Sequence, residues 1–368
     1  MRKCAVVSSL VAVGLCATAR AASPVGTPVR AQPTTAQEIV QRSIEARGGL
    51  AKLRAVRTLV LRGPARADGR PGRQMVRARP FSFTIGIEGN DGSPWEAYDS
   101  YGLVARVTHE PGAALRHAAY FDDPLVMSLE PGWTIELIGS ELFDGKDAYR
   151  LRVVFPDGWV NELFVDKQSG LLVGKRYTAP FHAFGEAVTT ETHVGGYRGV
   201  NGVLFPTRYA EYDLATGERL GGADDGWTSI EANVPVSPSA FSPPAAPDTP
   251  IARLVNAVFA ARAVTADALG WYHDFLANPD TAAIDATAAI ESVAYHCLKS
   301  GAVPTGLALL REVVQSHPAS AAAHFGLGRA YRAAGREEDA LAEFREALRL
   351  DPSFQAASQA IASRRLPY

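Results

Sequence analysis

The chain has 368 residues, of which 47% are hydrophobic and 21% are charged, and its formal net charge at pH 7 is -2. This length predicts two or three domains. Because the charges nearly cancel, no strong electrostatic field is expected to attract a nucleic acid or an anionic membrane surface. Beyond the N-terminus, no segment has the roughly 18 consecutive apolar residues that a transmembrane helix needs.

The first 21 residues have the organisation of a secretory signal peptide. Arg2 and Lys3 precede an apolar stretch over residues 5–17, and Ala19-Arg20-Ala21 supplies a small-x-small cleavage pattern. The apolar stretch is too short to span a membrane. Cleavage after Ala21 therefore predicts a periplasmic protein, and secretion from the cell is left open.

Two of the three cysteines, Cys4 and Cys16, lie in the predicted signal peptide. Cys16 ends the apolar stretch, but the preceding Leu15 stands where lipoprotein processing requires a small residue, which disfavours a lipid anchor. Cleavage leaves Cys297 alone, so no intramolecular disulfide is expected in the mature chain. Cys297 lies on an apolar helical stripe and is predicted to be a buried, unreactive thiol.

The mature chain is predicted to begin with a flexible segment over residues 22–34, which is rich in proline, alanine and threonine. A helix should follow, because Thr35 offers an N-cap and Glu38, three residues later, completes a capping box. Gly48-Gly49 is predicted to end this helix.

From residue 58 to about residue 234, apolar residues recur at every second position, which predicts β-strands. Asp157-Gly158 predicts a hairpin with a two-residue type I′ turn, and Asn201-Gly202 is also placed between strands. Strands recur about every eight to twelve residues with no predicted helix between them. We therefore expect one antiparallel sheet, curled into a barrel or half-barrel, within a domain over residues 35–234.

Residues 235–250 are rich in proline and predict a semi-rigid linker. Residues 251–368 are rich in alanine with apolar residues at helical spacing. The predicted fold class is thus α+β in two domains, with a curved antiparallel half-barrel followed by an all-α solenoid.

The helical part repeats with a period of about 34 residues, as in the tetratricopeptide repeat (TPR), most clearly at residues 287–320 and 321–354. Small residues at fixed positions let paired helices approach closely, and aromatic residues fill the space between pairs. About three helix pairs are needed for a stable array, so residues 251–277 should form a degenerate third pair packed by Trp271 and its neighbours Tyr272 and Phe275. Such arrays favour docking of a protein partner. The motif positions are His324, Leu327, Gly328, Tyr331, Ala340, Phe344, Ala347 and Pro352.

Several segments of the first domain resemble periplasmic proteins of the outer-membrane lipoprotein-sorting (LolA/LolB-like) family. The residues that carry the resemblance include Ala46-Arg47-Gly48-Gly49-Leu50, Phe143-Asp144-Gly145-Lys146, and Phe164-Val165-Asp166 with Gly170-Leu171-Leu172. The resemblance spans roughly residues 36–245. It implies a curved antiparallel sheet with an N-terminal helix over its concave face and an apolar cavity beneath, which binds acyl chains in the carrier members.

An acyl chain or a similar apolar ligand is favoured energetically, since each buried methylene contributes about 0.8 kcal/mol. The candidate inward-facing residues of the cavity are Phe81, Phe83, Ile85, Ile135, Leu137, Tyr149, Leu151 and Val153. The same residues could instead fill the barrel, because a small barrel can be packed by its own side chains. The chain would then be a protein-interaction scaffold without a small-molecule ligand.

No pattern of a known catalytic, metal or nucleotide site is found. Gly-x-Ser-x-Gly, His-Glu-x-x-His and the Walker A loop are absent from the sequence. His109, His117, Asp122 and Asp123 could meet in space, but surface or loop roles are the default interpretation. We therefore expect no enzyme, cofactor or metal, and a hydrolase-type enzyme with a dispersed site is the third alternative.

Overall fold

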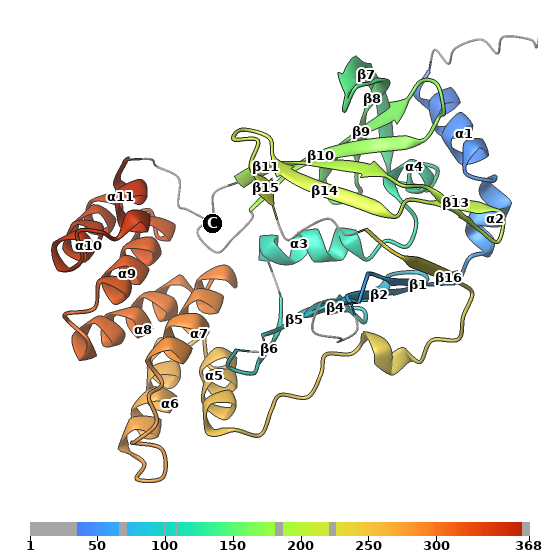
Figure 1. Ribbon diagram of the computed structural model, residues 1–368. Helices are drawn as coiled ribbons and strands as arrows, with labels where there is room; N and C mark the ends of the chain where they lie inside the picture. Colours follow the sequence, from blue (N-terminus) through green and yellow to red (C-terminus); the bar gives the residue numbers. More distant parts are fainter. Residues whose placement is uncertain are drawn as a thin grey trace, which may run out of the picture. The chain divides into compact units, whose positions relative to one another are not determined.

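The computed structural model describes residues 35–65, 72–98, 100–107, 109–180, 187–220 and 226–362. The predicted signal peptide, the segment 22–34 and Cys16 lie outside the described residues. None of the helices described is both long and apolar enough to cross a membrane. The described chain is α+β, with antiparallel sheets in its N-terminal two-thirds and helices after them (Figure 1).

The first sheet has seven strands in the order β16-β1-β2-β3-β4-β5-β6, and every neighbouring pair is antiparallel. Its strands are β1 (Thr58–Arg62), β2 (Gln74–Ala78), β3 (Ser82–Ile85), β4 (Glu88–Asn90), β5 (Pro94–Tyr98), β6 (Leu103–Arg106) and β16 (Ser229–Ala232). A short 3-10 helix, η1 (Pro238–Phe241), brings Phe241 against Val60 and Val76 on the face of this sheet away from the main core.

The second sheet also has seven strands, in the antiparallel order β15-β14-β11-β10-β9-β8-β7. Its strands are β7 (Thr134–Phe143), β8 (Lys146–Val154), β9 (Val160–Asp166), β10 (Leu172–Pro180), β11 (Ala187–Gly195), β14 (Arg208–Asp213) and β15 (Arg219–Leu220), and a separate hairpin joins β12 (Arg198–Val200) to β13 (Val203–Phe205). Neither sheet closes on itself, so the described strands form no closed barrel.

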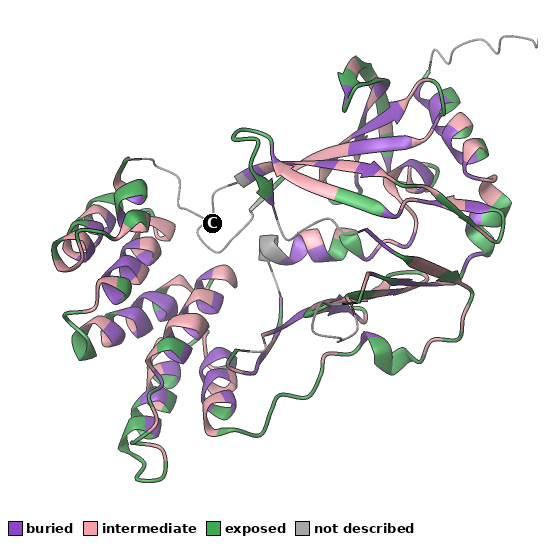
Figure 2. Cartoon of the chain, in the orientation of Figure 1, coloured by how far each residue is buried: buried purple, intermediate pink, exposed green. Residues whose placement is uncertain are grey.

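The main apolar core joins the two sheets and the short helices around them. It contains Leu59 of β1, Leu151 of β8, Leu163 of β9 and Ile39 of α1 (Ala36–Ala46), and it also includes residues of α2 (Leu50–Ala55) and α4 (Pro124–Met127). Figure 2 shows buried residues on strands of both sheets. The predicted start of α1 is confirmed, because Thr35 and Glu38 form the reciprocal hydrogen bonds of a capping box.

Two helices interrupt the strands where the sequence predicted none. Helix α3 (His109–Ala118) lies between the sheets and contacts β4, β5 and β10, and α4 follows it. The prediction of a single sheet without helices is therefore wrong. The start of α4 carried a recognisable signal, since Asp123 caps the backbone N–H groups of Leu125 and Val126.

One predicted turn is confirmed and one is wrong. Asn201 and Gly202 both have positive φ, as a type I′ turn between β12 and β13 requires. At Asp157-Gly158 only the glycine has positive φ, and its N–H donates to the carbonyl of Phe155. Pro156 precedes this pair and suits the second position of a type I turn, so the loop is longer than two residues.

The C-terminal part consists of seven helices, which share one apolar cluster with Leu103 and Ala105 of β6. Cys297 is buried in this cluster, as predicted. Tyr272 and Phe275 are buried as well, but Trp271 is 53% exposed and does not act as the predicted packing anchor. The helices are α5 (Pro250–Ala260), α6 (Thr265–Ala277), α7 (Thr287–Lys299), α8 (Val303–Ser316), α9 (Ala321–Ala333), α10 (Glu337–Leu350) and α11 (Gln355–Ala362).

The close packing of α9 on α10 leads to a prediction for two glycines of α9. A Cβ at Gly328 would lie 2.6 Å from the ring of Phe344, whereas a Cβ at Gly326 meets only Leu310 Cδ2, at 3.7 Å. We expect Gly328→Ala to lower the free energy of unfolding by about 1–3 kcal/mol through overpacking. Gly326→Ala, the matched control, should raise it by about 0.5–1 kcal/mol, because alanine has the higher helix propensity. Urea denaturation followed by circular dichroism measures both, and equal shifts in the same direction would contradict the packing described here.

Candidate functional site

The inner face of the second sheet, defined as the face toward the main core, changes in character between β9 and β10. Side chains that lie opposite each other on neighbouring antiparallel strands point to the same face. Starting at the core, one such row runs through Leu137, Leu151 and Leu163. It continues with Lys175, Thr192 and Glu211 on β10, β11 and β14. Along this row the inner face is apolar over β7 to β9, polar or charged over β10, β11 and β14, and apolar again at Leu220 of β15.

Six of the eight predicted cavity residues belong to the main core. Leu151 and Val153 have no exposed surface, Tyr149 is buried, and three others, Ile85, Ile135 and Leu137, are partly buried at the edge of the core. These residues pack against side chains of this chain.

The two remaining residues lie elsewhere. Phe83 is buried in a separate small cluster with Leu115 and Ala119 near α3. Phe81 is 47% exposed, and its ring forms a T-shaped contact with the ring of Tyr120.

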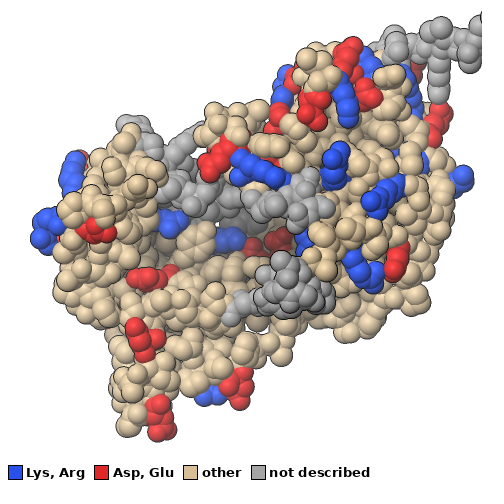
Figure 3. Space-filling model, in the orientation of Figure 1, with Lys and Arg blue, Asp and Glu red and all other residues tan. Residues whose placement is uncertain are grey.

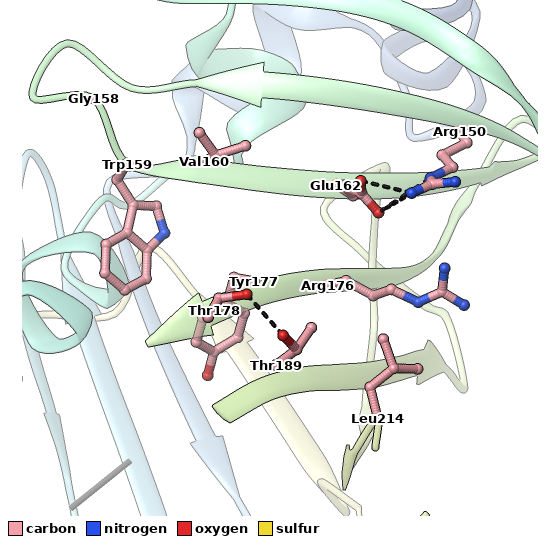
Figure 4. Close-up of a pocket in the computed structure, with 10 residues that line it drawn as sticks. All are labelled: Arg150, Gly158, Trp159, Val160, Glu162, Arg176, Tyr177, Thr178, Thr189 and Leu214. Carbon is pink, nitrogen blue, oxygen red and sulfur yellow. Dashed lines mark hydrogen bonds and ion pairs between the residues drawn. The ribbon is translucent and has the colours of Figure 1, made fainter. Parts of the chain in front are cut away.

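A groove of about 550 Å³ lies on the second sheet (Figure 4). Most of its lining side chains belong to the outer face, opposite the core. The apolar part of the lining includes Trp159, Val160 and Leu214, and the polar part includes Thr178, whose hydroxyl lies 2.8 Å from that of Thr189. The other lining residues are Arg150, Gly158, Glu162, Arg176 and Tyr177.

Ion pairs lie at the polar end of the groove. Arg150 binds Glu162 at 2.7 Å, and Arg176 binds Glu141 at 2.8 Å and Glu191 at 2.7 Å. The hydrogen bonds to Glu162 raise the pKa of Arg150 above its usual range. Charged side chains of both signs are visible over this sheet in Figure 3. Because each arginine is already paired, these residues contribute shape and polarity to the groove more than net charge.

An aromatic cluster extends from the turn between β2 and β3 of the first sheet to the groove. Its ring centroids are separated by 5.3 Å between Phe81 and Tyr120, by 5.2 Å between Tyr120 and Trp133, and by 4.5 Å at its other end, between His117 and Trp159. Trp159 itself lines the groove. We define this aromatic cluster as Phe81, His117, Tyr120, Trp133, Phe155 and Trp159.

Acidic side chains occupy the inner face of the first sheet beyond β3. Opposite each other on β4 and β5 lie Glu88 and Glu96, and Lys299 of α7 binds Glu96 at 2.6 Å. Burial, and then the nearby charge of Glu96, raise the pKa of Glu88 to about 7. Glu88 is therefore partly protonated near neutral pH, and Glu96 is neutralised by Lys299.

Of the four residues that could have formed a polar site, the three whose side chains are described pair with other residues. Asp122 pairs with Arg79 at 2.5 Å, Asp123 pairs with Arg47, and His117 lies 2.9 Å from Asp157. The side chain of His109 lies outside the described residues. Within the described part of the chain, no group of three His, Cys, Asp or Glu residues could hold a metal ion.

The TPR motif residues occupy the packing positions of α9 and α10. Six of them are buried, namely His324, Leu327, Gly328, Ala340, Phe344 and Ala347. Tyr331 packs against the same cluster while partly exposed. His324 Nδ1 lies 2.6 Å from Glu343. Pro352 is exposed after the end of α10.

One family model of known proteins matches part of the helical region. Residues 298–353 match the family model of the tetratricopeptide repeat. No curated protein matches the chain. The β part is similar in fold to three solved structures, which share 11–14% sequence identity with it.

The first is a LolA superfamily protein from Nitrosomonas europaea (14% identity, TM-score 0.30, 57% of this chain and 98% of that chain). The second is a DUF1329 family protein from Desulfovibrio piger (12% identity, TM-score 0.34, 56% and 97%). The third is a putative outer membrane lipoprotein-sorting protein domain from Vibrio parahaemolyticus (11% identity, TM-score 0.33, 56% and 95%). Similarity at this level concerns the fold and says nothing of a ligand.

The raised pKa of Glu88 predicts how stability depends on pH. The folded protein keeps this carboxyl protonated up to about pH 7, whereas the unfolded chain ionises it near 4.5. The folded state therefore binds more protons in this range, and its stability falls as pH rises through it. Glu88→Gln removes this effect. The free energy of unfolding of the variant minus that of the wild type should therefore increase from about pH 5 to pH 8, by on the order of 1–3 kcal/mol.

Urea denaturation at both pH values measures this difference. Glu136→Gln, at an exposed position of β7, is the matched control and should show no such change. An unchanged difference for Glu88→Gln would mean that this carboxyl ionises normally in the folded protein.

Proposed function

We propose that the chain is an exported, periplasmic binding protein. In this proposal residues 35–234 bind an apolar or amphipathic ligand, and the TPR helices within residues 251–368 dock a protein partner. The Pro-rich segment 235–250 joins these two domains. We assign no catalytic step and no cofactor to either part.

The observation that carries the ligand proposal is the continuity of the aromatic cluster with the groove. Trp159 belongs to both. The groove volume of about 550 Å³ lies within the range of roughly 300–1,000 Å³ that is usual for small-molecule sites. Aromatic side chains offer large, rigid apolar surfaces, and tryptophan also carries a polar N–H. Such a surface suits a ligand with an apolar portion and a polar end.

The predicted cavity residues take different roles in this proposal. We infer that the ligand's apolar portion contacts Phe81 at the exposed end of the aromatic cluster and the partly buried Ile85, Ile135 and Leu137 at the core edge. Leu151 and the other fully packed residues then support the sheet from within. Access deeper into the core would require α1 to move away from the sheet.

A second candidate function is favoured by the packing of the core. Because Leu151 and Val153 have no exposed surface, the core needs no ligand for its stability. The chain would then be a scaffold that contacts proteins only, through its TPR helices. The two candidates differ in whether the isolated protein binds a small apolar probe.

Replacement of groove residues tests the ligand proposal. We expect Trp159→Ala and Leu214→Asp to weaken binding of the neutral fluorescent probe N-phenyl-1-naphthylamine at least tenfold, because one removes an aromatic wall and the other places a charge in the groove. Leu214 is 44% exposed, so its replacement should leave the fold intact. Probe fluorescence measures the affinity, and circular dichroism verifies the fold.

The control is Trp271→Ala, which removes an exposed tryptophan of α6 that does not line the groove. It should bind the probe like the wild type. A wild-type protein that does not bind the probe would favour the scaffold function, and equal binding by all variants would place any ligand outside the groove.

A further inference from the structure

Two basic side chains point into the space between the sheets from opposite sides. Arg77 on β2 lies opposite Leu59, and Lys175 on β10 lies opposite Leu163. Both leucines belong to the main core. Since residues that lie opposite each other share a face, both basic side chains are on the inner faces of their sheets.

Lys175 has no hydrogen bond or ion pair with any residue in the described part of the chain. Burial, as the main cause, and the charge of Arg77 lower its pKa, while Glu211 acts in the opposite direction. The ammonium group of Lys175 lies over the ring of Tyr177, with Nζ 5.1 Å from the ring centroid. Lys175 is partly buried and makes no ion pair with a described residue, so its ammonium group is open to a ligand that supplies a negative charge.

Arg77 is held in place without a carboxylate. Its guanidinium donates to the backbone carbonyl oxygens of Ala118, at 2.9 Å, and of Tyr120, at the end of α3. Its Nε is buried and has no hydrogen-bond partner within the described residues. The positive charge of Arg77 is thus oriented but not neutralised by a direct ion pair.

Tyr209 adds a hydroxyl group to the same region. It lies opposite Val194 on the inner face and keeps 38% of its surface exposed. Burial is nevertheless the main cause that raises its pKa to about 12, and Arg77 acts against this increase. The hydroxyl of Tyr209 is thus within electrostatic reach of Arg77, and part of the side chain is exposed.

Acidic groups nearby do not cancel the two positive charges. Glu211 accepts a hydrogen bond from Thr192 at 3.4 Å and forms no ion pair with Lys175. Glu96 is paired with Lys299, and Glu88 is partly protonated near neutral pH. Of the charged side chains named here, Arg77 and Lys175 are the basic ones that form no ion pair with a described residue, against Glu211.

We propose that Lys175 and Arg77, with the hydroxyl of Tyr209, bind the anionic end of the ligand, a carboxylate or a phosphate group. This inference rests on the proposed function and names its ligand class as an acidic amphiphile. Tyr177 lies on the same inner face, with its ring centroid 5.1 Å from Lys175 Nζ. The aromatic cluster also reaches the space between the sheets, through Trp133 and Phe155 of the main core. The apolar portion of the ligand then extends along the aromatic cluster.

Calorimetric titration with decanoate and with 1-decanol tests the proposal, because the two differ only in the charged end. The wild type should bind decanoate at least tenfold more tightly. Lys175→Met should lose this preference and still bind 1-decanol like the wild type, and Lys175→Arg should restore it. Lys146→Met, which removes an exposed lysine of β8, is the matched control and should keep the preference. Arg77 is left intact, since it also holds the end of α3.

A competition experiment distinguishes a free anion from the head group of an amphiphile as the group that binds Lys175. Competition by inorganic phosphate that depends on Lys175 would indicate that a free anion suffices, whereas no competition would assign the site to an amphiphile's head group. Equal affinity of the wild type for decanoate and 1-decanol would overturn the anionic site and leave the proposed function standing. If neither compound nor the neutral naphthylamine probe binds, the proposed function itself fails.

Discussion

Leu163 and Lys175 lie opposite each other on neighbouring strands, and at this pair one row of side chains across the inner face of the second sheet changes from apolar to charged. On one side of the boundary, leucine and valine side chains pack with α1 and α4 into a core that stabilises the domain. On the other side, lysine, threonine and glutamate face the first sheet. An inner face with both characters can accommodate a molecule that also has both, with an apolar portion and a charged end.

Much of the fold could be predicted because its signals are local. The capping box at Thr35, the type I′ turn at Asn201-Gly202 and the 34-residue spacing of the TPR motif each depend on residues close in sequence. The buried residues of α9 and α10, such as Phe344, follow directly from that spacing.

The candidate site could be predicted only in part, because it depends on register. A register shift between Leu172 and Gly174 places Val173 on the outer face with Phe164, and Lys175 on the inner face opposite Leu163. Strict alternation would have put positions 173 and 175 on the same face. A bulge of this kind has no dependable sequence signal, so sequence reasoning missed Lys175.

The groove was missed for a different reason. Trp159 and Leu214 are far apart in the sequence, and only the sheet brings them to one surface. The interruption by α3 and α4 was also missed, although Asp123 followed by Pro124 is a recognisable start of a helix. The predicted cavity residues were chosen by alternation alone, which identifies a buried face but does not distinguish a packed core from a binding cavity.

The helices are connected to the β part through specific contacts. Lys299 of α7 binds Glu96 of β5 at 2.6 Å, and both side chains are largely buried. A buried ion pair contributes little net stability but is costly to break by removing one partner. Leu103 and Ala105 of β6 belong to the same apolar cluster as α5 and α7. A partner docked on the TPR helices would therefore lie on elements that contact the sheet carrying Arg77.

Native mass spectrometry of the mature protein, isolated from its host without delipidation, tests the central claim most directly. The account predicts a protein that carries an additional mass, which denaturation releases as an acidic molecule with an apolar portion. Protein that is consistently isolated at the mass of its polypeptide alone, under conditions that preserve other lipid complexes, would contradict it.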